Sequence, residues 1–334
     1  MLASAVNGKS EFSGLRPFNP LRDIKPITKL IELSFGEDLE PSSRKMLNEM
    51  RSLSWLLGPA LWLLSKTKSP LASTFGGYVW LEAGRIVGNI TVHTRYKGRM
   101  GWFISNLAVH PDYRRQDIAF RLVTEGLELA RTKGAQRVSL EVRAKNVTAQ
   151  GLYRKLGFTK VDSVSRMRLS RVPGVDRVPA GEYRTRALQA DEWRKVYQLA
   201  LDTISPEARE ILSVEEKDYR SSFPQPLISG LRDLLKGQAV YRWAALKGDR
   251  FLGLANLRAG GALAPHSLTM MVHPDHRGEV EEILLTKALS TLNAYPSRPL
   301  SAKIQPSCEG VVEVFAKYGF VEVETLDLLT LRLQ

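Results

Sequence analysis

The chain has 334 residues, which corresponds to about two domains, and its 43% hydrophobic and 25% charged residues exclude a fully disordered, collagen-like or coiled-coil protein. One cysteine, Cys308, excludes a disulfide framework and a cysteine-rich metal site, and it fits a reducing cytoplasm. Residues 1–172 hold 28 Lys and Arg against 14 Asp and Glu, whereas residues 173–334 hold 20 against 21. The basic half suits a polyanionic ligand, although on charge alone a solubilising surface is the simpler interpretation.

The N-terminal part shows no targeting or membrane-spanning segment. Residues 1–17 are mixed and polar and lack the apolar core of a signal peptide. The longest apolar run, Leu53–Leu64, is too short to span a bilayer as a helix, and Gly58-Pro59 interrupts it. We expect no stable membrane insertion. The run covers the core, lines a hydrophobic ligand pocket or touches a membrane surface, and covering the core is the commonest role for such a segment.

Hydrophobic periodicity and turn residues predict an alternation of strands and helices in the first half. In chain order we expect a strand at 14–17, a helix with Asp23 near its start, a hairpin of 78–82 and 86–95, a strand at 102–109, a helix at 118–133, a strand at 137–142, a helix at 147–156 and two final strands at 159–162 and 164–169. The two final strands would close the first domain.

The second half repeats this order. The segment Val109–Arg115 (VHPDYRR) recurs as Val272–Gly278 (VHPDHRG), and Leu152–Phe158 (LYRKLGF) recurs as Val314–Phe320 (VFAKYGF). Weaker matches relate Arg85–Gly88 to Arg250–Gly253, and Arg16 with Asp23 to Arg184 with Asp191. The corresponding elements are strands at 183–187, 241–246, 251–257 and 267–272, a helix at 280–293 and final strands within 321–333. We predict domains over 1–172 and 173–334, with a linker over 171–181.

The strongest chemical signal is Asn106–Ala119 (NLAVHPDYRRQDIA), which predicts a strand, a turn, a basic loop and the start of a helix. Such a loop presents unpaired backbone N–H groups and the positive end of a helix dipole to an anion. Arg114, Arg115 and Arg121 add positive charge beside it. A pyrophosphate is the natural ligand of this arrangement, although without further context the segment is an ordinary strand–helix connection with surface arginines.

Further along the chain, Asn146–Phe158 fits the pattern N-x-x-A-x-x-L-Y-x-K-x-G-F. The two motifs together resemble the GNAT superfamily of acyl-CoA-dependent acyltransferases, in which the loop reads Arg/Gln-x-x-Gly-x-Gly/Ala. Here it reads R-x-x-D-x-A over Arg114–Ala119. The resemblance covers most of residues 14–170, and the second half looks like a degenerate copy. It implies an α/β (α+β) fold of two tandem domains, each a mixed, mostly antiparallel sheet flanked by helices.

The resemblance implies acetyl-CoA as co-substrate, with no metal. The strands at 102–109 and 137–142 would splay apart, so that the pantetheine arm pairs with the backbone of Leu107, Ala108 and Val109. The pyrophosphate would lie on the backbone amides of the loop beside Arg114, namely those of Arg115, Gln116, Asp117, Ile118 and Ala119.

The resemblance also gives roles to side chains outside the loop. Tyr153 matches the position that in this family often protonates the leaving thiolate, and a phenol with a pKa of about 10 is a sensible donor, although the residue could equally be a core aromatic. Glu141 is the first candidate for a general base and His93 the second, but a merely structural role is simpler for each, and ordered water could serve instead. His110 fits a structural role. Asn146 would orient the cofactor or cap its helix, and we prefer the cap.

Two departures from the family pattern affect the prediction. Asp117 stands where the family has Gly, so a carboxylate would repel the diphosphate, yet Asp near a helix N-terminus is also a good cap. In the second half, the loop Arg277–Glu282 (RGEVEE) puts Glu282 at the small-residue position, and Phe315 replaces the tyrosine and has no proton to give. We therefore expect the second domain not to catalyse but to pack against the first and wall the acceptor cleft.

The leading hypothesis is an acetyl-CoA-dependent N-acetyltransferase, in which a primary amine of a small-molecule or peptide acceptor attacks the acyl group directly. A non-catalytic acyl-CoA-binding or sensory protein is the alternative. A nucleic-acid or ribosome-binding module is a third possibility, but the basic residues are scattered and no zinc finger is present, so we expect no nucleic acid partner. For the oligomeric state, we expect a monomer or a homodimer.

Overall fold

The computed structural model describes residues 12–36, 41–52, 59, 75–94, 101–175, 181–212, 214–221, 239–261, 265–304 and 309–333. Apart from Pro59, the apolar run Leu53–Leu64 lies outside these residues, and so do residues 176–180 of the predicted linker. The chain forms two compact units: the first is Met1–Glu141, Gly151–Thr159 and Thr330–Gln334, and the second is Val142–Gln150 and Lys160–Leu329. Neither unit is a continuous segment of the chain.

The first half contains the predicted elements, with one exception and two additions. Its elements are β1 (Gly14–Pro17), α1 (Pro20–Phe35), α2 (Pro41–Ser52), β2 (Phe75–Glu82), β3 (Arg85–Thr94), β4 (Gly101–Val109), the 3-10 helix η2 (Pro111–Tyr113), α5 (Ile118–Thr132), β5 (Arg137–Arg143), α6 (Val147–Lys155) and β6 (Thr159–Leu169). One strand, β6, replaces the two predicted at 159–162 and 164–169, and α2 and η2 are added. Strands β1 to β4 pair antiparallel in sequence order, and β4 pairs parallel with β5. The predicted mixed, mostly antiparallel sheet is confirmed.

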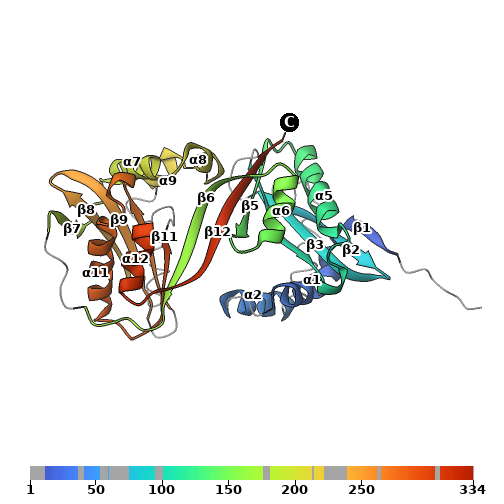
Figure 1. The fold of residues 1–334 in the computed structure, drawn as a ribbon, viewed down its shortest axis with the longest axis horizontal. Coiled ribbons are helices and arrows are strands. Elements are labelled where there is room, and N and C mark those ends of the chain that lie inside the picture. Colours follow the sequence, from blue (N-terminus) through green and yellow to red (C-terminus); the bar gives the residue numbers. More distant parts are fainter. Residues whose placement is uncertain are drawn as a thin grey trace, which may run out of the picture. The chain divides into compact units, whose positions relative to one another are not determined.

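Local chemistry explains the main elements of the first unit. Ala83 and Gly84 join β2 to β3 with φ of 46° and 75°, as the tight hairpin turn with two left-handed residues requires. Helix α5 buries one stripe at helical spacing and packs on β3, where Gly88 allows a close approach: a Cβ there would lie 2.9 Å from Ile118. Helices α1 and α5 lie on opposite faces of this sheet (Figure 1).

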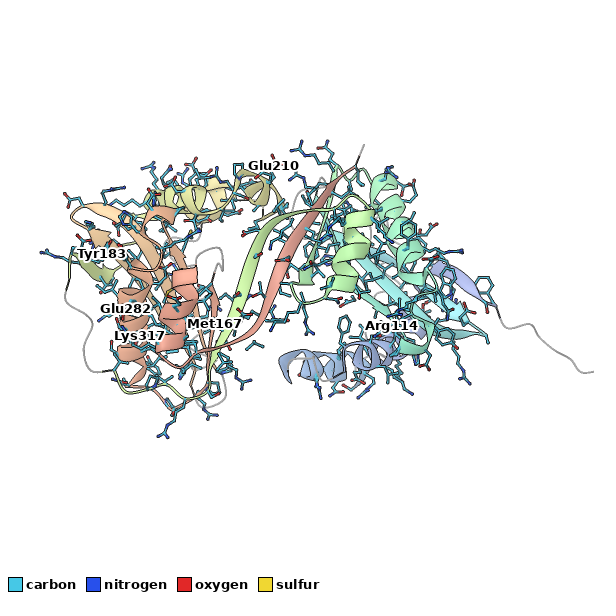
Figure 2. The ribbon with its side chains drawn as sticks, in the orientation of Figure 1. Arg114, Met167, Tyr183, Glu210, Glu282 and Lys317 are labelled. Carbon is cyan, nitrogen blue, oxygen red and sulfur yellow. The ribbon has the colours of Figure 1, made fainter. Side chains whose placement is uncertain are left out.

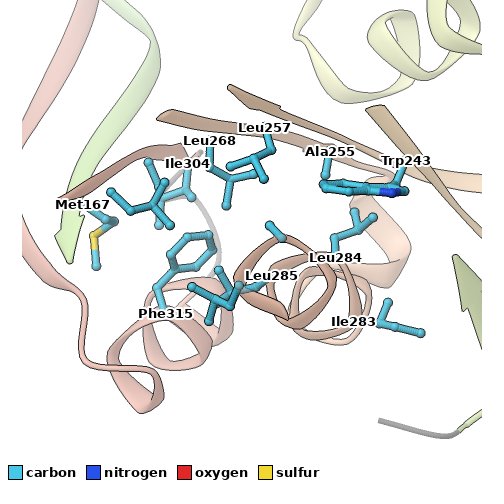
Figure 3. Packing of buried hydrophobic residues seen from close by; sticks show 14 of the residues in the cluster. Met167, Trp243, Ala255, Leu257, Leu268, Ile283, Leu284, Leu285, Ile304 and Phe315 are labelled. Carbon is cyan, nitrogen blue, oxygen red and sulfur yellow. The ribbon is translucent and has the colours of Figure 1, made fainter. Parts of the chain in front are cut away.

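The second half follows with β7 (Tyr183–Ala187), α7 (Trp193–Thr203), α8 (Pro206–Leu212), α9 (Glu216–Ser221), β8 (Ala239–Lys247), β9 (Arg250–Ala259), β10 (His266–Val272), η3 (Pro274–His276), α11 (Val280–Leu292), β11 (Leu300–Ile304), α12 (Glu309–Lys317) and β12 (Val321–Arg332). Figure 3 shows its core, in which Leu284 and Leu285 of α11 and Phe315 of α12 pack against Leu257 and Leu268 of the sheet. Burial of this apolar surface is the main force that stabilises the unit.

The last strand of each half is exchanged. The strand order is β1-β2-β3-β4-β5-β12-β6-β11-β10-β9-β8-β7. Strand β6 pairs antiparallel with β11, and its Met167 is 2% exposed within the core of the second unit. The end of β12 lies instead in the first unit, where Leu333 N donates to Gln136 O at 2.9 Å. The prediction that two strands at 159–162 and 164–169 close the first domain is therefore wrong, because one continuous strand leaves it.

Near the start of each half, the residues that correspond to one another differ from those predicted. Arg16 holds Asp23 with two hydrogen bonds of 2.7 and 2.8 Å, and in the second unit Arg186 holds Glu192 at 2.7 and 2.6 Å. Each carboxylate also accepts a backbone N–H at the start of its helix. The counterparts of Arg16 and Asp23 are thus Arg186 and Glu192, not Arg184 and Asp191, because the strand register decides which side chain faces the helix.

Ser34 and Thr203 confirm this alignment. Their hydroxyls donate to Val109 O at 3.2 Å and to Val272 O at 3.5 Å, respectively. Helix α1 therefore corresponds to α7 residue by residue over this stretch. Among the described residues, no helix is long and apolar enough to cross a membrane.

Candidate active site

Strand β4 carries a β-bulge near its end. Asn89 of β3 pairs with Ala108 and Thr91 pairs with Ser105, so β4 has one residue more than its partner over this stretch. Asn106, within the bulge, has a φ of 53°, in the left-handed region. A bulge interrupts the ladder and redirects backbone groups. It lies beside Leu107, Ala108 and Val109, the backbone predicted to bind the pantetheine arm.

A buried side chain holds the bulge in place. Asn89 is 1% exposed, and its Nδ2 donates to Asn106 O at 2.7 Å. Its Oδ1 is buried and has no hydrogen-bond partner among the described residues. A buried amide with one unsatisfied oxygen costs stability, so its retention at this position is consistent with a role in shaping the bulge. Sequence reasoning missed Asn89; its signal is a polar residue within the apolar run of β3 (RIVGNITV).

Strands β4 and β5 are paired only over their first residues. The parallel register runs from Gly101 with Arg137 to Ile104 with Leu140 and then ends. The bulged half of β4 is therefore unpaired on the β5 side in this register. This matches the predicted splay between the two strands, and it leaves backbone N–H and C=O groups of β4 available to a ligand.

The loop after β4 presents a row of backbone donors. His110 caps η2 by accepting the Asp112 N–H, which gives it the expected structural role. Arg115 and Asp117 then both adopt left-handed backbone, with φ of 61° and 56°. The first bond into α5 runs from Arg121 N to Asp117 O at 3.0 Å. Among the described residues, no acceptor is found for the N–H groups of residues 115–120. Alternating backbone handedness of this kind forms a concave anion site.

The side chains of the loop differ in what they do. Arg114 donates to Ser34 O at 3.0 Å and to Val109 O at 3.3 Å, so it braces α1 against β4 (Figure 2). Arg277 makes the same contact with Thr203 O at 3.4 Å in the second unit. Arg115 is exposed, and Arg121 lies 5.6 Å from the centroid of the Trp80 ring. The guanidinium of Arg114 is thus held by two carbonyl oxygens, whereas Arg115 is exposed beside the amides.

Asp117 does not cap its helix with its side chain. It occupies the N-cap position of α5 but makes no side-chain cap hydrogen bond. The expectation of a capping role is wrong, because the left-handed φ of 56° is not the extended conformation from which an N-cap side chain reaches the amides. The neighbouring loop residue Gln116 is exposed, whereas Ile118 is buried and anchors α5.

Tyr153 lies in α6 and is 6% exposed. Its ring meets Phe158 edge-on, with centroids 5.7 Å apart. Burial raises the pKa of the Tyr153 phenol above its ordinary value, so the hydroxyl stays protonated at neutral pH. A proton donor must carry its proton before the reaction, so this state is compatible with the role of general acid.

The remaining predicted residues lie as follows. Glu141 is exposed on β5, one residue beyond the last β4–β5 pair. His93 is half-buried on β3, with its ring centroid 5.9 Å from that of Phe103. Asn146 accepts the Ala149 N–H at 3.0 Å, and so it caps α6 as preferred. No group of three metal-ligating side chains occurs in the described ranges.

The equivalent loop of the second unit is one residue shorter. Ile118 and Val280 are equivalent, because each packs against the glycine of the facing strand, Gly88 or Gly253. Seven residues separate His110 from Ile118, but only six separate His273 from Val280. The residue opposite Ala119 is therefore Glu281 and not Glu282, which corrects the predicted alignment.

Glu281 fills the loop of the second unit with its own carboxylate. It is 4% exposed, and its Oε2 accepts the Gly278 N–H at 2.7 Å. Burial raises the pKa of the Glu281 carboxyl. Glu282 instead pairs with Lys317 at 2.5 Å (Figure 2). The amides that are free in the first unit are thus partly satisfied in the second by the chain itself.

Two further differences separate the units. Strand β10 pairs with β9 without a register shift from Ser267 to Val272, so it lacks the bulge of β4. Phe315 takes the place of Tyr153 and packs edge-on against Phe320 with centroids 5.0 Å apart. The fold is repeated, but the features that present donors and a phenol occur in the first unit.

Comparison with known proteins agrees with this geometry. Residues 47–158 match the model of the Acetyltransferase (GNAT) family. They contain β4, the loop before α5, Asn89 and Tyr153.

Curated relatives match over short stretches of this chain. The [ribosomal protein bS18]-alanine N-acetyltransferase of Escherichia coli K12 is 40% identical over 55 residues, which are 16% of this chain and 37% of that protein. N-alpha-acetyltransferase 30 of Schizosaccharomyces pombe is 31% identical over 99 residues, 28% of this chain and 63% of that protein. The chain thus spans less than two thirds of the length of these relatives.

Solved structures match the fold over nearly the whole chain. A GCN5-related N-acetyltransferase from Sphaerobacter thermophilus has a TM-score of 0.57 at 16% identity and covers 95% of both chains. A tandem GNAT protein from the clavulanic acid biosynthesis pathway has a TM-score of 0.50 at 18% identity, covering 95% of this chain and 98% of that one. The predicted tandem GNAT fold is confirmed.

Proposed function

We propose that the first unit is an acetyl-CoA-dependent N-acetyltransferase. The observation that carries the proposal is the row of unpaired amides over residues 115–120, between a bulged strand and a helix N-terminus. This arrangement fits a diphosphate in shape and charge. The match of residues 47–158 to the GNAT family supports acyl-CoA as the source of that diphosphate.

Each part of the site then has a task. The amides of the loop hold the diphosphate, and the backbone of Leu107, Ala108 and Val109, which lies beyond the last β4–β5 pair, aligns the pantetheine arm. Bound acetyl-CoA supplies an activated acyl group and, after transfer, a thiolate that needs a proton. Tyr153 holds a proton at its hydroxyl for that thiolate. Glu141 or ordered water takes the proton of the attacking amine, with backbone N–H groups at the splay stabilising the carbonyl oxygen.

The acceptor we propose is the N-terminal amine of a peptide or protein. The curated relatives are named for an alanine N-acetyltransferase of a ribosomal protein and for an N-alpha-acetyltransferase, and both names describe such an amine. A small-molecule amine is the other acceptor class. We further propose a cytoplasmic location, a monomer or homodimer, and a second domain, residues 173–334, that does not catalyse.

The test begins with acetyl-CoA binding by isothermal titration calorimetry, followed by release of free thiol with peptide and small-molecule amines. We expect one bound acetyl-CoA per chain and turnover with peptide amines. Tyr153→Phe should lower kcat by a factor on the order of 100 and leave the acetyl-CoA Kd unchanged. Tyr318→Phe, in the second unit, should change neither value.

The outcomes separate the alternatives. Binding without thiol release for any amine would indicate a non-catalytic acyl-CoA-binding protein. Salt-dependent RNA binding with no acetyl-CoA binding would indicate a nucleic-acid module and overturn the enzyme hypothesis.

A further inference from the structure

The first unit contains a cavity beside α1, apart from the loop before α5. Its volume is about 530 Å³, within the range of small-molecule sites. Residues of β1, α1, the β2–β3 hairpin and His110 line it, and none of residues 114–119 does. The cavity is therefore built from a different part of the unit than the predicted diphosphate site.

Positive charge dominates the wall of this cavity. The lining includes Arg16, Arg22, Lys29 and Arg85 against one carboxylate, Asp23. Asp23 is 1% exposed and is already neutralised by the bidentate contact with Arg16 at 2.7 and 2.8 Å. Three cationic side chains thus remain in excess around the cavity.

The excess charges are available to a ligand. Arg22 has a 61% exposed side chain whose Nε lies 3.7 Å from Asp23. In the part of the chain that the structure describes, neither Lys29 nor Arg85 takes part in an ion pair, and both are exposed. Cations grouped along one wall raise the local concentration of anions.

The rest of the wall is mostly apolar. Leu30, Leu33, Leu81, Ile86 and Val87 contribute to it beside His110. Leu33 is 50% exposed, so a ligand in the cavity would remove apolar surface from water there. The cavity therefore offers an apolar floor beside a cationic rim.

The second unit provides an internal comparison, because α7 corresponds to α1. In that alignment Arg22 corresponds to Asp191, Lys29 to Gln198 and Leu33 to Asp202, while Arg85 corresponds to Arg250. The same framework thus exists without the charge excess and without the exposed leucine. The cationic, apolar-floored cavity is a property of the first unit and not of the shared fold.

We propose that this cavity binds a small organic anion, with its carboxylate or phosphate against Arg22, Lys29 and Arg85 and a short apolar body on Leu33 and Ile86. The site is separate from the proposed acetyl-CoA site, so the two are occupied together. An amphiphilic anion satisfies both walls, whereas an inorganic anion leaves the apolar floor exposed to water.

The test uses octanoate, with octyl phosphate, inorganic phosphate and neutral octanamide as comparisons, in calorimetric titrations of the full chain. We expect one octanoate per chain with a Kd on the order of 0.1–1 mM, as its number of atoms allows. Octyl phosphate should bind comparably or more tightly. Inorganic phosphate and octanamide should each bind at least tenfold more weakly than octanoate.

Variants on the surface locate the site. Lys29→Gln and Arg85→Gln should each raise the octanoate Kd about five- to tenfold, and Leu33→Asp should abolish binding. The matched control is Arg250→Gln, the counterpart of Arg85, which should bind as the wild type does. Circular dichroism melting confirms that these exposed substitutions leave the fold intact.

Four results would overturn the proposal. The first is unchanged octanoate binding in Lys29→Gln and Arg85→Gln, and the second is an equal loss in Arg250→Gln. The third is inorganic phosphate binding as tightly as octanoate. The fourth is displacement of octanoate by saturating acetyl-CoA, which would make the cavity part of the cofactor site. If acetyl-CoA fails to bind, the proposed acetyltransferase function is wrong. Octanoate binding by the Lys29, Arg85 and Leu33 variants still tests the anion site independently.

Discussion

Asp117 combines two unfavourable features in the loop before α5. It adopts φ of 56°, where glycine is the least strained residue, and it adds a carboxylate beside amides that we expect to bind a diphosphate. Asp and Asn tolerate the left-handed region better than other non-glycine residues, which accounts for its presence in this conformation. Charge, more than backbone strain, is therefore its main cost to ligand binding.

We predict that Asp117→Asn tightens acetyl-CoA binding about three- to tenfold, corresponding to about 1 kcal/mol from removal of one nearby negative charge. Asparagine keeps the tolerance for positive φ, so the loop geometry is retained. Calorimetric titration measures the effect. Asp112→Asn is the matched control, since its side chain is 80% exposed in the same loop, and it should change the Kd less than twofold. Equal effects of the two substitutions would contradict the prediction.

Glu281, which lies opposite Ala119, is a buried carboxylate in the equivalent loop of the second unit. Burial raises the pKa of Glu281 above its ordinary value of 4.5, so the folded chain binds this proton more strongly than the unfolded chain does. The free energy of unfolding therefore falls as the pH rises through the unfolded pKa toward the folded one.

We predict that Glu281→Gln raises the free energy of unfolding at pH 7 by about 1 kcal/mol and flattens its decline above pH 4.5. The glutamine oxygen can still accept the Gly278 N–H. Urea unfolding at pH 4.5 and pH 7 gives both values. Glu282→Gln should act with the opposite sign and by less than about 0.5 kcal/mol, because Lys317 lowers the pKa of Glu282. Destabilisation at pH 7 by Glu281→Gln would refute this account.

At the scale of elements, strand β4 departs from its repeat β10. Each pairs with the preceding strand, but only β4 has a register shift, at the point where Asn89 holds the backbone of Asn106. The shift redirects the last residues of the strand, so the surface that we propose for the cofactor depends on one buried amide. In the second unit, Asn256 of β9 also has a buried oxygen without a partner among the described residues, but it faces a regular strand.

We predict that Asn89→Ala weakens acetyl-CoA binding about tenfold and lowers the free energy of unfolding by about 1 kcal/mol, since it removes a buried hydrogen bond and an unsatisfied oxygen together. Calorimetry and urea unfolding measure the two effects. Asn256→Ala is the matched control and should leave acetyl-CoA binding unchanged. An unaltered Kd in Asn89→Ala would show that the bulge persists without its amide.

At the scale of the whole chain, the exchanged strands tie each unit to the other half of the sequence. Ser139 of β5 and Thr330 of β12 are both buried, and their hydroxyls lie 3.2 Å apart. Thr330 also lies within 3.5 Å of Val138 O. The edge of β5 in the first unit is thus covered by residues from the end of the chain. Unpaired strand edges are exposed to solvent and to wrong pairing, so this cover is required for a stable sheet.

We predict that deletion of residues 330–334 exposes β5 and lowers the free energy of unfolding of the first unit by about 2–3 kcal/mol. Hydrogen exchange should accelerate at the amides of 137–143 and remain unchanged in β8 and β9. As a control, Thr325→Val removes the Ser165–Thr325 contact in the second unit and should spare β5. Unchanged protection of β5 in the deletion variant would mean that another segment covers this edge.

The sequence by itself determined the number of copies, the order of most elements and the position of the loop between β4 and α5. These depend on local signals: apolar periodicity for α5, Gly84 at the β2–β3 turn, and the repeated VHPD segment before the basic loop. Tyr153 and Phe315 could also be matched because their flanking residues repeat. Each of these signals acts within a few residues of the element it specifies.

Only the tertiary structure decided which residues face one another. Two of these contacts depend on strand register: Arg186 pairs with Glu192, and Asn89 donates to the backbone of the β4 bulge. Two other features depend on loop length or on distant strands: the Glu281 carboxylate accepts the Gly278 N–H within its own loop, and β6 and β12 are exchanged between the units. A shift of one residue in a strand or loop turns a side chain to the other face and leaves the local pattern unchanged. Sequence periodicity is the same for both registers, so packing and hydrogen bonding make the choice.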